Sequence, residues 1–299
     1  MSGPILVFGA GGMVGREIAR LAGLRAIPMV GVAHQEADIT DADAIARAIE
    51  RARPRLIVNA AAYTAVDRAE SEPEAALAGN ALGPGVLAAA AERCGAPLVH
   101  LSTDYVFDGA KPSPYVESDP VCPVSVYGRT KAQGEERVRE VGARHVILRT
   151  AWVYGAFGAN FLKTMVRLAR ERDELRVVAD QQGCPTCASD IAEAVLAVDR
   201  SLEAGAQAFG LYHFAGTGET SWHGFAEAIV AAQAQWSGRR PAVTAIATAD
   251  YPTPARRPPN SRLDSSLFAA TFGYKAADWR ARTNETVREL CAPESGAAQ

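Results

Sequence analysis

The first two dozen residues contain the pattern that most narrows the possible folds of this chain. An apolar run over residues 5–8 ends at Gly9, and two further glycines follow at positions 12 and 15. Apolar residues from Val14 to Leu21 then recur at helical spacing. This order predicts a buried strand, a tight turn and a helix that begins at the turn. The chain therefore opens with a strand–turn–helix unit.

The same alternation continues through the first half of the chain. The pattern predicts further strands over 27–33, 56–58, 97–101 and 145–148, and helices over 41–53, within 72–94 and over 126–141. Thr40 is the expected N-cap of the helix over 41–53. Strands that alternate with helices form a parallel sheet, because each helix crosses over to the next strand. The predicted fold class is therefore α/β, with a doubly wound parallel sheet of the Rossmann type.

The second half has a looser pattern. Helices are predicted over 161–172, 190–202, 221–235 and 280–290, and the proline-rich segment 251–259 is predicted to be a loop because proline lacks an amide donor. We assign residues 1–150 to a dinucleotide-binding domain. Residues 151–299 are assigned mainly to a smaller substrate-binding lobe, with some segments returning to the sheet. The tail from about residue 293 is predicted to be frayed.

Charge and composition exclude several classes of partner. The 299 residues are 48% hydrophobic and carry 31 basic and 34 acidic side chains, for a net charge of -3. This balance creates no overall field toward nucleic acid or anionic lipid. No apolar run approaches the length of a membrane helix, and the five cysteines are an odd number, which favours a reducing compartment. We expect a cytoplasmic protein with no nucleic-acid or membrane partner.

The three glycines predict how a cofactor is bound. Gly9 permits the tight turn, Gly12 leaves room for a pyrophosphate, and Gly15 lets the helix pack on the sheet. The N-terminus of the helix then faces the anion. The stricter G-x-G-x-x-G pattern is not met, because position 14 is Val. An ordinary strand–helix turn is the alternative, but the place of the motif after the first strand favours a dinucleotide site.

The end of the second predicted strand bears on the choice of cofactor. The residues there are Ala33, His34, Gln35 and Glu36, so no acid stands at the position that usually binds the ribose hydroxyls of NAD. This pattern permits NADPH without excluding NADH. Asp38 is expected to border the adenine pocket.

Tyr127 and Lys131 form the candidate catalytic pair. They are four residues apart in a predicted helix and therefore share one of its faces. A nearby ammonium should lower the pKa of the phenol from about 10, so that the phenol can exchange a proton with a carbonyl or alkoxide oxygen. Lys131 can also bind the nicotinamide ribose. Thr103 follows a predicted strand and is expected to bind the same substrate oxygen, which favours catalysis over a chance surface pair.

These motifs together resemble a known family. The glycine turn, Thr103 and the Tyr127/Lys131 pair are similar to those of the extended short-chain dehydrogenase/reductases. The resemblance narrows to the dTDP-4-dehydrorhamnose reductase family through five sequence blocks: 59–73, 102–107, 149–154, 180–186 and 251–263. It implies reduction by NADPH or NADH of the 4-keto group of dTDP-4-dehydro-β-L-rhamnose, a dTDP-sugar, to give dTDP-L-rhamnose.

The resemblance also implies roles for individual residues. Tyr127 would protonate the sugar O4, Lys131 would orient the nicotinamide ribose, and Thr103 would contact the sugar. The expected cofactor contacts, besides Tyr127 and Lys131, are Gly9, Gly12, Met13, Val14, Asp38, Ile39, Ala62, Tyr63 and Thr64. The expected substrate contacts are Thr103, Asp104, Trp152, Asn160 and Arg257.

Other functions remain open at this stage. One is a reductase that forms another dTDP-6-deoxyhexose, such as the talose epimer. A second is a non-catalytic NADP-binding regulatory subunit like that of methionine adenosyltransferase, and a third is an epimerase or dehydratase that retains NAD⁺. Related dehydratases have Glu after the Thr-Asp pair, whereas this chain has Tyr105, which favours simple reduction.

Metal binding is not expected. Members of the family are described as dimers bridged by Mg²⁺ through glutamates. Glu17 matches one such position, but Ser189 stands where the other acid is expected. The pair Cys184 and Cys187 has zinc-like spacing without a second pair to complete four ligands. We therefore predict no metal, and a monomer or a homodimer.

Overall fold

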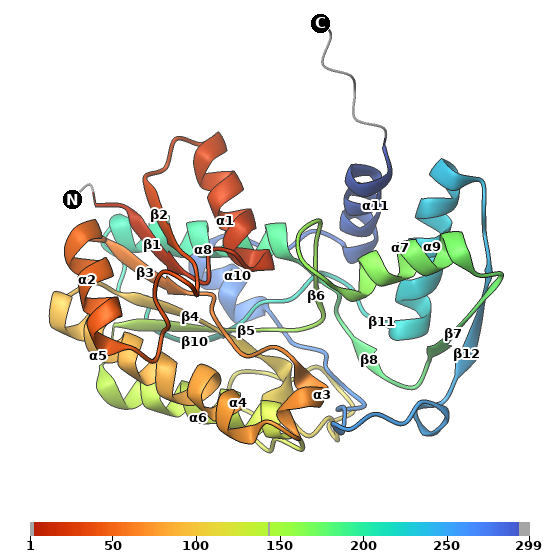
Figure 1. The fold of residues 1–299 in the computed structure, drawn as a ribbon, viewed down its shortest axis with the longest axis horizontal. Coiled ribbons are helices and arrows are strands. Elements are labelled where there is room, and N and C mark those ends of the chain that lie inside the picture. Colours follow the sequence, from red (N-terminus) through yellow and green to blue (C-terminus); the bar gives the residue numbers. More distant parts are fainter. Residues whose placement is uncertain (1–2, 143, 293–299) are drawn as a thin grey trace, which may run out of the picture.

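A computed structural model describes residues 3–142 and 144–292 of the chain. Its centre is a six-stranded sheet in the order β10-β5-β4-β3-β1-β2, in which all pairings are parallel (Figure 1). The strands are β1 (Ile5–Phe8), β2 (Met29–Val32), β3 (Leu56–Asn59), β4 (Leu98–Thr103), β5 (His145–Thr150) and β10 (Gly210–His213). The prediction of a doubly wound parallel sheet is confirmed.

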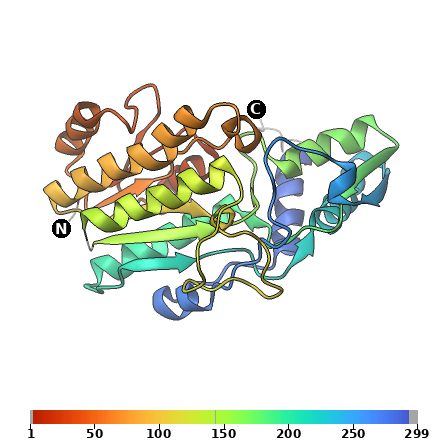
Figure 2. The same ribbon diagram turned by 90° about the horizontal axis from the view of Figure 1, so that it is seen from below.

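Helices cover both faces of this sheet (Figures 1 and 2). One face carries α1 (Met13–Leu24) and α8 (Ala188–Glu203), and the other carries α2 (Ala42–Ala52), α5 (Gly83–Cys94) and α6 (Val126–Val141). β1, β3 and most of β4 and β5 are buried, because apolar side chains pack against helices on both sides.

Two local predictions need correction. The second strand is shorter than predicted, and the N-cap of α2 is Asp41 rather than Thr40. The Asp41 side chain accepts hydrogen bonds from the amides of Asp43 and Ala44. The Thr40 hydroxyl donates instead to Asp38 Oδ1, at 2.8 Å. Threonine and aspartate are both good caps, so the sequence alone does not separate adjacent positions.

The segment predicted to contain a helix within 72–94 is more complex. After α3 (Val66–Ala69) it holds α4 (Pro73–Leu77), a π-helical segment η1 (Ala78–Leu82) and then α5. Such π-helical turns are rare and often mark functional sites.

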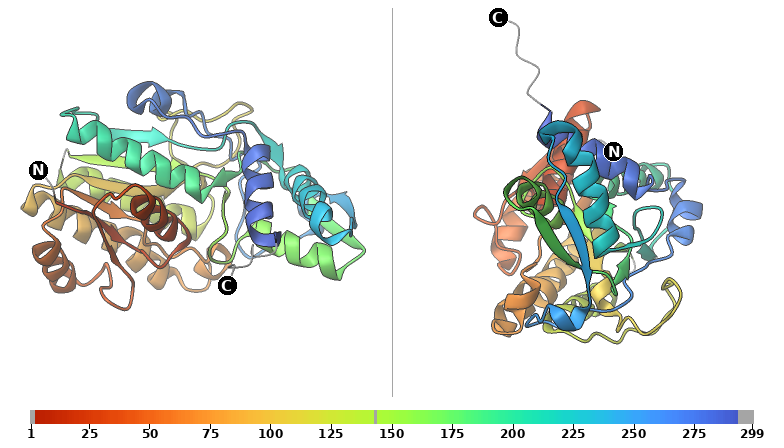
Figure 3. Two further views of the ribbon diagram at one scale, coloured as in Figure 1. Left: turned by 90° about the horizontal axis from the view of Figure 1, so that it is seen from above. Right: turned by 90° about the vertical axis from the view of Figure 1, so that its right-hand side faces the viewer.

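A second lobe lies at one end of the molecule, beyond the carboxyl ends of the strands (Figures 1 and 3). It contains α7 (Phe161–Glu171), α9 (Trp222–Ser237), α11 (Trp279–Cys291) and the parallel pair β7 (Glu174–Val178) and β12 (Ala242–Ile246), which the sequence did not predict. Shorter elements are η2 (Asp104–Val106), β6 (Val153–Tyr154), β8 (Gln182–Gly183), β9 (Thr186–Cys187), β11 (Thr220–Ser221) and η3 (Thr248–Asp250).

Some segments of the second half return to the sheet. They are α8, β10 and α10 (Ser266–Phe272). β10 is the edge strand beside β5, and α8 and α10 pack near it. The tail predicted to be frayed, 293–299, lies outside the described residues. Within the described ranges no helix is long and apolar enough to span a membrane.

Candidate functional site

The glycine turn after β1 brings the backbone close to its neighbours. Gly9 has a φ of 81°, in the region that favours glycine, and a Cβ there would lie 2.5 Å from the amide nitrogen of Ala61. A Cβ on Gly15 would collide with the carbonyl oxygen of Gly9. Gly9 and Gly15 are therefore needed for the turn and for the packing of α1 on it.

The start of α1 fits an anionic cofactor. Gly12 is the N-cap, no side chain of the described residues caps the helix, and its first turn contains no acid. Backbone amides at such a terminus attract a diphosphate. The loop after β6 borders this turn, since Met13 Sδ would lie 3.5 Å from a Cβ at Gly155 and Arg16 lies 5.6 Å from the Phe157 ring centroid. This geometry suits the pyrophosphate of a dinucleotide.

The predicted cofactor residues after β3 are held by a residue that the sequence analysis missed. Asn80 in η1 accepts a hydrogen bond from the amide of Tyr63 at 2.9 Å and donates to the Tyr63 carbonyl at 3.1 Å. It also donates to the hydroxyl of Thr130, on α6, at 3.2 Å. Asn80 thus ties the segment Ala62–Thr64 to the helix of Tyr127. The available sequence signal was a polar residue in an apolar stretch between glycines at 79 and 83.

Asp38 and Ile39 differ in their exposure. The Asp38 carboxylate is exposed and accepts hydrogen bonds from the amide and hydroxyl of Thr40, which lower its pKa. Ile39 is buried, and a Cβ on Gly83 would lie 2.5 Å from its Cγ1. Ile39 therefore anchors the loop after β2 on α5, while Asp38 stays accessible.

Thr103 and Asp104 lie at the carboxyl end of β4. Thr103 is the last residue of the strand, and its hydroxyl donates to Asp104 Oδ1 at 3.0 Å while accepting from the amide of Tyr105 at 3.2 Å. Ligands bind at this edge of parallel sheets because the strand ends and loops converge there. The predicted location of both residues is therefore compatible with substrate binding.

Helix α6 brings Tyr127 and Lys131 to the same edge. Ser125 caps the helix by accepting from the amide of Gly128 at 3.1 Å, and Glu70 accepts from the amide of Val126 at 2.8 Å. A Cβ on Gly128 would collide with the carbonyl oxygen of Tyr105. The glycine therefore allows the first turn of α6 to lie against η2, next to Thr103.

Tyr127 is half-buried, and the expectation that Lys131 lowers the pKa of its phenol is wrong for this structure. Burial raises the pKa above its usual value of 10, and the adjacent Asp104 raises it further, while the nearby Thr103 hydroxyl opposes the shift. The ring of Tyr105 packs edge-on against Tyr127, with centroids 5.3 Å apart. The phenol is therefore protonated at neutral pH, as a proton donor must be.

Lys131 is also buried, at 2% exposure. Its ammonium donates to the carbonyl of Leu101 in β4, at 2.6 Å. Burial lowers the pKa of Lys131 to about 8, and the charge of Glu135 acts in the opposite direction.

Asp104 is the third displaced ionisable group of this site. Burial raises its pKa to about 6, against the effect of hydroxyls of Ser261 and Thr103. Its Oδ2 is buried without a hydrogen-bond partner in the described part of the chain. A buried carboxyl oxygen of this kind is suited to a polar ligand group such as a sugar hydroxyl.

The predicted substrate residues Trp152 and Asn160 already have contacts within the protein. Trp152 has a φ of 49° and stacks on Trp222, with ring centroids 3.6 Å apart. Trp222 was not predicted as a neighbour of the site. Asn160 caps α7: its Oδ1 accepts from the amide of Lys163 and its Nδ2 donates to the carbonyl of Gly155. Contact of either residue with a nucleotide stays a prediction.

Arg257 links the proline-rich loop to the segments that follow β3 and β4. Its guanidinium donates to Asp67 Oδ2 at 2.8 Å and to the hydroxyl of Tyr105 at 3.0 Å. Since Tyr105 packs on Tyr127, the Tyr105 side chain connects Arg257 to the candidate proton donor. The sequence indicated Arg257, but not its pairing with Asp67.

Comparison with known proteins identifies the family of the chain. The family model described as RmlD substrate binding domain matches residues 3–292. The chain belongs to that family. A relative from Burkholderia thailandensis, named dTDP-4-dehydrorhamnose reductase, is 49% identical over 96% of this chain and 98% of its own. A relative of the same name from Escherichia coli K12 is 42% identical over 96% and 97%.

Solved structures of RmlD-family proteins have the same fold. A dTDP-4-dehydrorhamnose reductase of Clostridium acetobutylicum is 38% identical, with a TM-score of 0.88 over 96% of this chain and 99% of that chain. One from Bacillus anthracis, in complex with NADP, is 32% identical, with a TM-score of 0.88 over 97% and 100%. The fold of the RmlD family therefore extends over both halves of this chain.

The residues considered for metal binding in this RmlD-family chain are engaged in contacts within the protein or are unreactive. Burial raises the pKa of Cys184 to about 11 and also raises that of Cys187. Thiols of this kind are unreactive. Glu17 is buried and forms an ion pair with Arg20 at 2.8 Å, and Ser189 contacts Cys187 Sγ at 3.1 Å. The described residues hold no cluster of three or more metal-binding side chains.

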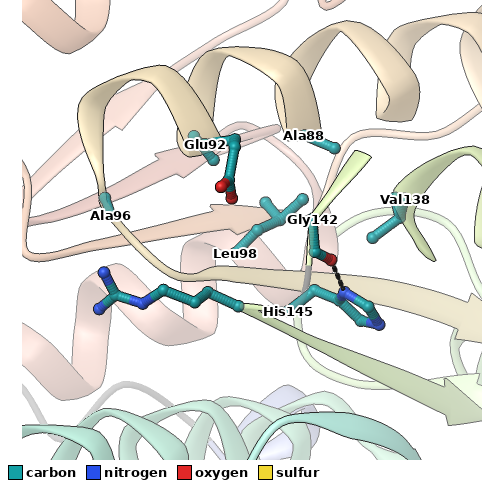
Figure 4. A pocket seen from close by; sticks show the side chains of 9 residues that line it. Ala88, Glu92, Ala96, Leu98, Val138, Gly142 and His145 are labelled. Atoms are coloured by element: carbon teal, nitrogen blue, oxygen red, sulfur yellow. Dashed lines mark hydrogen bonds between the residues drawn. The ribbon is translucent and has the colours of Figure 1, made fainter. Parts of the chain in front are cut away.

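A small cavity lies at the opposite end of the sheet (Figure 4). It has a volume of about 10 Å³ and lies near the amino ends of β4 and β5, where His145 Nδ1 lies 2.7 Å from the carbonyl of Gly142. None of the predicted site residues lines it. A cavity of this size has room for about one water molecule. It is separate from the candidate site of this RmlD-family chain.

Proposed function

We propose that this protein catalyses the NAD(P)H-dependent reduction of dTDP-4-dehydro-β-L-rhamnose to dTDP-L-rhamnose. The observation that carries the proposal is the placement of Thr103, Tyr127 and Lys131 at the carboxyl edge of the sheet that also carries the glycine turn. Relatives named dTDP-4-dehydrorhamnose reductase match almost the whole chain, which supports the choice of substrate.

The cofactor residues are those that surround the start of α1. Gly9, Gly12 and the first amides of α1 would hold the pyrophosphate, with Met13 and Val14 beside it. Asp38 and Ile39 would border the adenine, and Ala62, Tyr63 and Thr64 would border the cofactor after β3. NADPH or NADH, when bound, supplies the hydride for the reduction.

Proton transfer is assigned to Tyr127, with Thr103 and Lys131 beside it. The reduced oxygen needs a proton, and Tyr127 carries one at neutral pH because burial raises its pKa. The Thr103 hydroxyl can donate a hydrogen bond to the same oxygen. Lys131 would orient the nicotinamide ribose.

The substrate residues lie where the lobe meets the sheet. Asp104 would accept from a sugar hydroxyl, and Trp152 would pack against the sugar nucleotide. Arg257 is suited to the diphosphate, since a guanidinium can bind phosphate oxygens in bidentate fashion. Asn160 would lie beside it, at the start of α7. We also propose that the enzyme acts in the cytoplasm as a monomer or homodimer, without a nucleic-acid or membrane partner.

The test is a coupled assay that identifies the product. Upstream enzymes would convert dTDP-glucose to the keto-sugar, NADPH and NADH oxidation would be followed by absorbance, and the reduced sugar would be identified by NMR. We expect oxidation of the cofactor and a rhamno product. A talo product would replace the substrate assignment with that of a sister reductase. Absence of oxidation would favour a regulatory subunit, and tightly bound NAD⁺ in the purified protein would favour an epimerase or dehydratase.

A further inference from the structure

A fully buried ion pair lies directly behind the candidate site. The side chains of Glu135 and Arg149 are 0% and 1% exposed. Arg149 Nη2 donates to Glu135 Oε2 at 2.6 Å, and Arg149 Nε donates to Oε1 at 2.8 Å. The hydroxyl of Ser102 also donates to Oε1, at 2.6 Å. Both carboxylate oxygens are therefore engaged.

This pair joins the same two elements that form the site. Glu135 follows Lys131 by one turn of α6, so the two side chains share a face of the helix. On β4, the carbonyl of Leu101 accepts from Lys131, and the next residue, Ser102, donates to Glu135. The residue after that is Thr103. The contact of Lys131, the contact of Glu135 and the site residue Thr103 thus occupy three consecutive positions of one strand.

Stability alone does not account for such a pair. Taking two charges out of water is costly, and apolar residues of similar volume often stabilise a fold as well or better. Removing only one partner is strongly destabilising, because the other charge is left buried. The location of Glu135 beside a buried ammonium supplies a functional reason for keeping the pair.

Glu135 is the anion that favours the charged form of Lys131. Burial lowers the pKa of Lys131 to about 8, and the charge of Glu135 raises it. His100, on β4, is another ionisable group near Lys131, and its pKa is affected by the Lys131 charge. His100 is uncharged, because burial and Lys131 itself keep its pKa well below the ordinary value.

We propose that Glu135 is a positioning residue for Lys131. Its carboxylate, fixed by Arg149 and Ser102, keeps the Lys131 ammonium charged and directed along β4 toward the ribose of the cofactor. This inference rests on the role that the proposed function gives to Lys131. It adds a residue of the helix interior to the catalytic apparatus, through its effect on another side chain.

The test follows cofactor affinity as a function of pH. The dissociation constant of NADH would be measured by fluorescence between about pH 6 and pH 9.5, where loss of the Lys131 proton weakens binding and produces a bend. In Glu135→Gln we expect the bend to move about one pH unit lower, because the nearby negative charge is lost. The matched control is Ser102→Ala, which removes a hydrogen bond to the same carboxylate but no charge. Its bend should stay at the wild-type pH.

Two further variants keep the outcome decisive. Glu135→Gln/Arg149→Met removes both buried charges, so it avoids an unpaired guanidinium if the single variant does not fold, and its bend should also move lower. A bend at the wild-type pH in that double variant would overturn the inference. Lys131→Met should abolish the bend. If the bend persists in Lys131→Met, the role proposed for Lys131 fails, which is a different result from failure of Glu135 alone.

Discussion

The three ionisable residues of the site share one property: burial favours the uncharged form of each. It raises the pKa of Tyr127 and Asp104 and lowers that of Lys131. Strongly displaced pKa values at one edge of a sheet are typical of functional sites. The Thr103 hydroxyl opposes the displacement at Tyr127, and the charge of Glu135 opposes it at Lys131. Single substitutions at these residues can therefore test the effect on kcat and the effect on unfolding free energy separately.

Tyr127→Phe should remove the proton donor and little else. We expect kcat to fall by about 10²–10⁴-fold, the usual contribution of general acid catalysis, with the dissociation constant of NADPH nearly unchanged. Steady-state kinetics and fluorescence titration measure the two quantities. Tyr105→Phe is the matched control, because this neighbouring phenol contacts Arg257 and is assigned no proton transfer. A Tyr127→Phe variant with a near-normal kcat would remove the residue from the mechanism.

Asp104→Asn should stabilise the folded protein, although it removes the carboxylate assigned to substrate binding. The pKa of Asp104 is raised to about 6 in the folded chain, above its unfolded value, so the charged form is disfavoured by folding. The stability cost is absent below the unfolded pKa, grows as pH rises toward 6, and is complete above it. We expect the free energy of unfolding to rise by about 1 to 3 kcal/mol at pH 7, with no gain near pH 3.5.

Urea denaturation at the two pH values measures this effect. Asp108→Asn is the control of opposite sign, since hydrogen bonds from the Ala110 amide and the Tyr115 hydroxyl lower the pKa of Asp108. That variant should lose stability at pH 7. An equal gain for Asp104→Asn at both pH values would show that the carboxyl is not displaced.

At the scale of elements, glycines determine how closely the helices approach the sheet. Gly15 on α1 and Gly128 on α6 both lie where a Cβ would collide with a backbone carbonyl oxygen, of Gly9 and Tyr105 respectively. Each contact brings the beginning of a helix to the carboxyl ends of the strands. The cofactor part and the proton-transfer part of the site therefore both depend on a glycine that allows close backbone contact.

Gly15→Ala should weaken both folding and cofactor binding, because the added methyl group pushes α1 away from the glycine turn. We expect a loss of about 1 to 3 kcal/mol in unfolding free energy and a marked increase in the NADPH dissociation constant. Gly23→Ala, near the end of the same helix, is the matched control. A Cβ there would meet no described atom within 4 Å, so alanine should be neutral or stabilising by up to about 1 kcal/mol. Equal behaviour of the two variants would exclude the close approach at Gly15 as the cause.

Elements with strong local signals were predicted well. Helix α6 has the predicted bounds, because Ser125 is a good N-cap and Gly142 follows the last turn. The π-helical segment was not predicted, since Asn80, which lies in it, makes its hydrogen bonds with Tyr63 and Thr130, residues far away in the sequence. β7 and β12 were missed because each has only five residues and is partly exposed. Their pairing joins segments far apart in the sequence.

The residues of the site also differ in whether local sequence patterns could predict them. Tyr127, Lys131 and Thr103 follow from spacing within one helix and from a strand end, both of which are local patterns. The Glu135–Arg149 pair and the Arg257–Asp67 pair join charges from different elements, and charged residues in a sequence are usually exposed. Only the tertiary structure shows which of them are buried or paired.

At the scale of the molecule, the proline-rich loop connects the lobe to the first domain. Asn260 donates to the carbonyls of Lys111 and Ser113, and Arg257 donates to Asp67 and Tyr105. The loop and the adjacent Asn260 thus hold the segment after β4, against which the first turn of α6 also packs. The Arg257–Asp67 pair is part exposed, with side chains at 27% and 39%, and such pairs contribute little to stability. The guanidinium can therefore exchange partners with an incoming diphosphate.

Arg257→Met tests whether this connection also binds the substrate. We expect the KM for the keto-sugar and the dissociation constant of dTDP, measured by calorimetry, to rise about 10-fold or more, because a hydrogen bond to a charged group is lost. The effect on kcat should be smaller, since Arg257 reaches Tyr127 only through Tyr105. Arg256→Met is the control, because Arg256 is adjacent, carries the same charge and is exposed. If both variants bind dTDP like the wild type, Arg257 only joins the lobe to the domain. If both weaken it equally, the binding reflects the overall charge of the loop rather than a specific contact of Arg257.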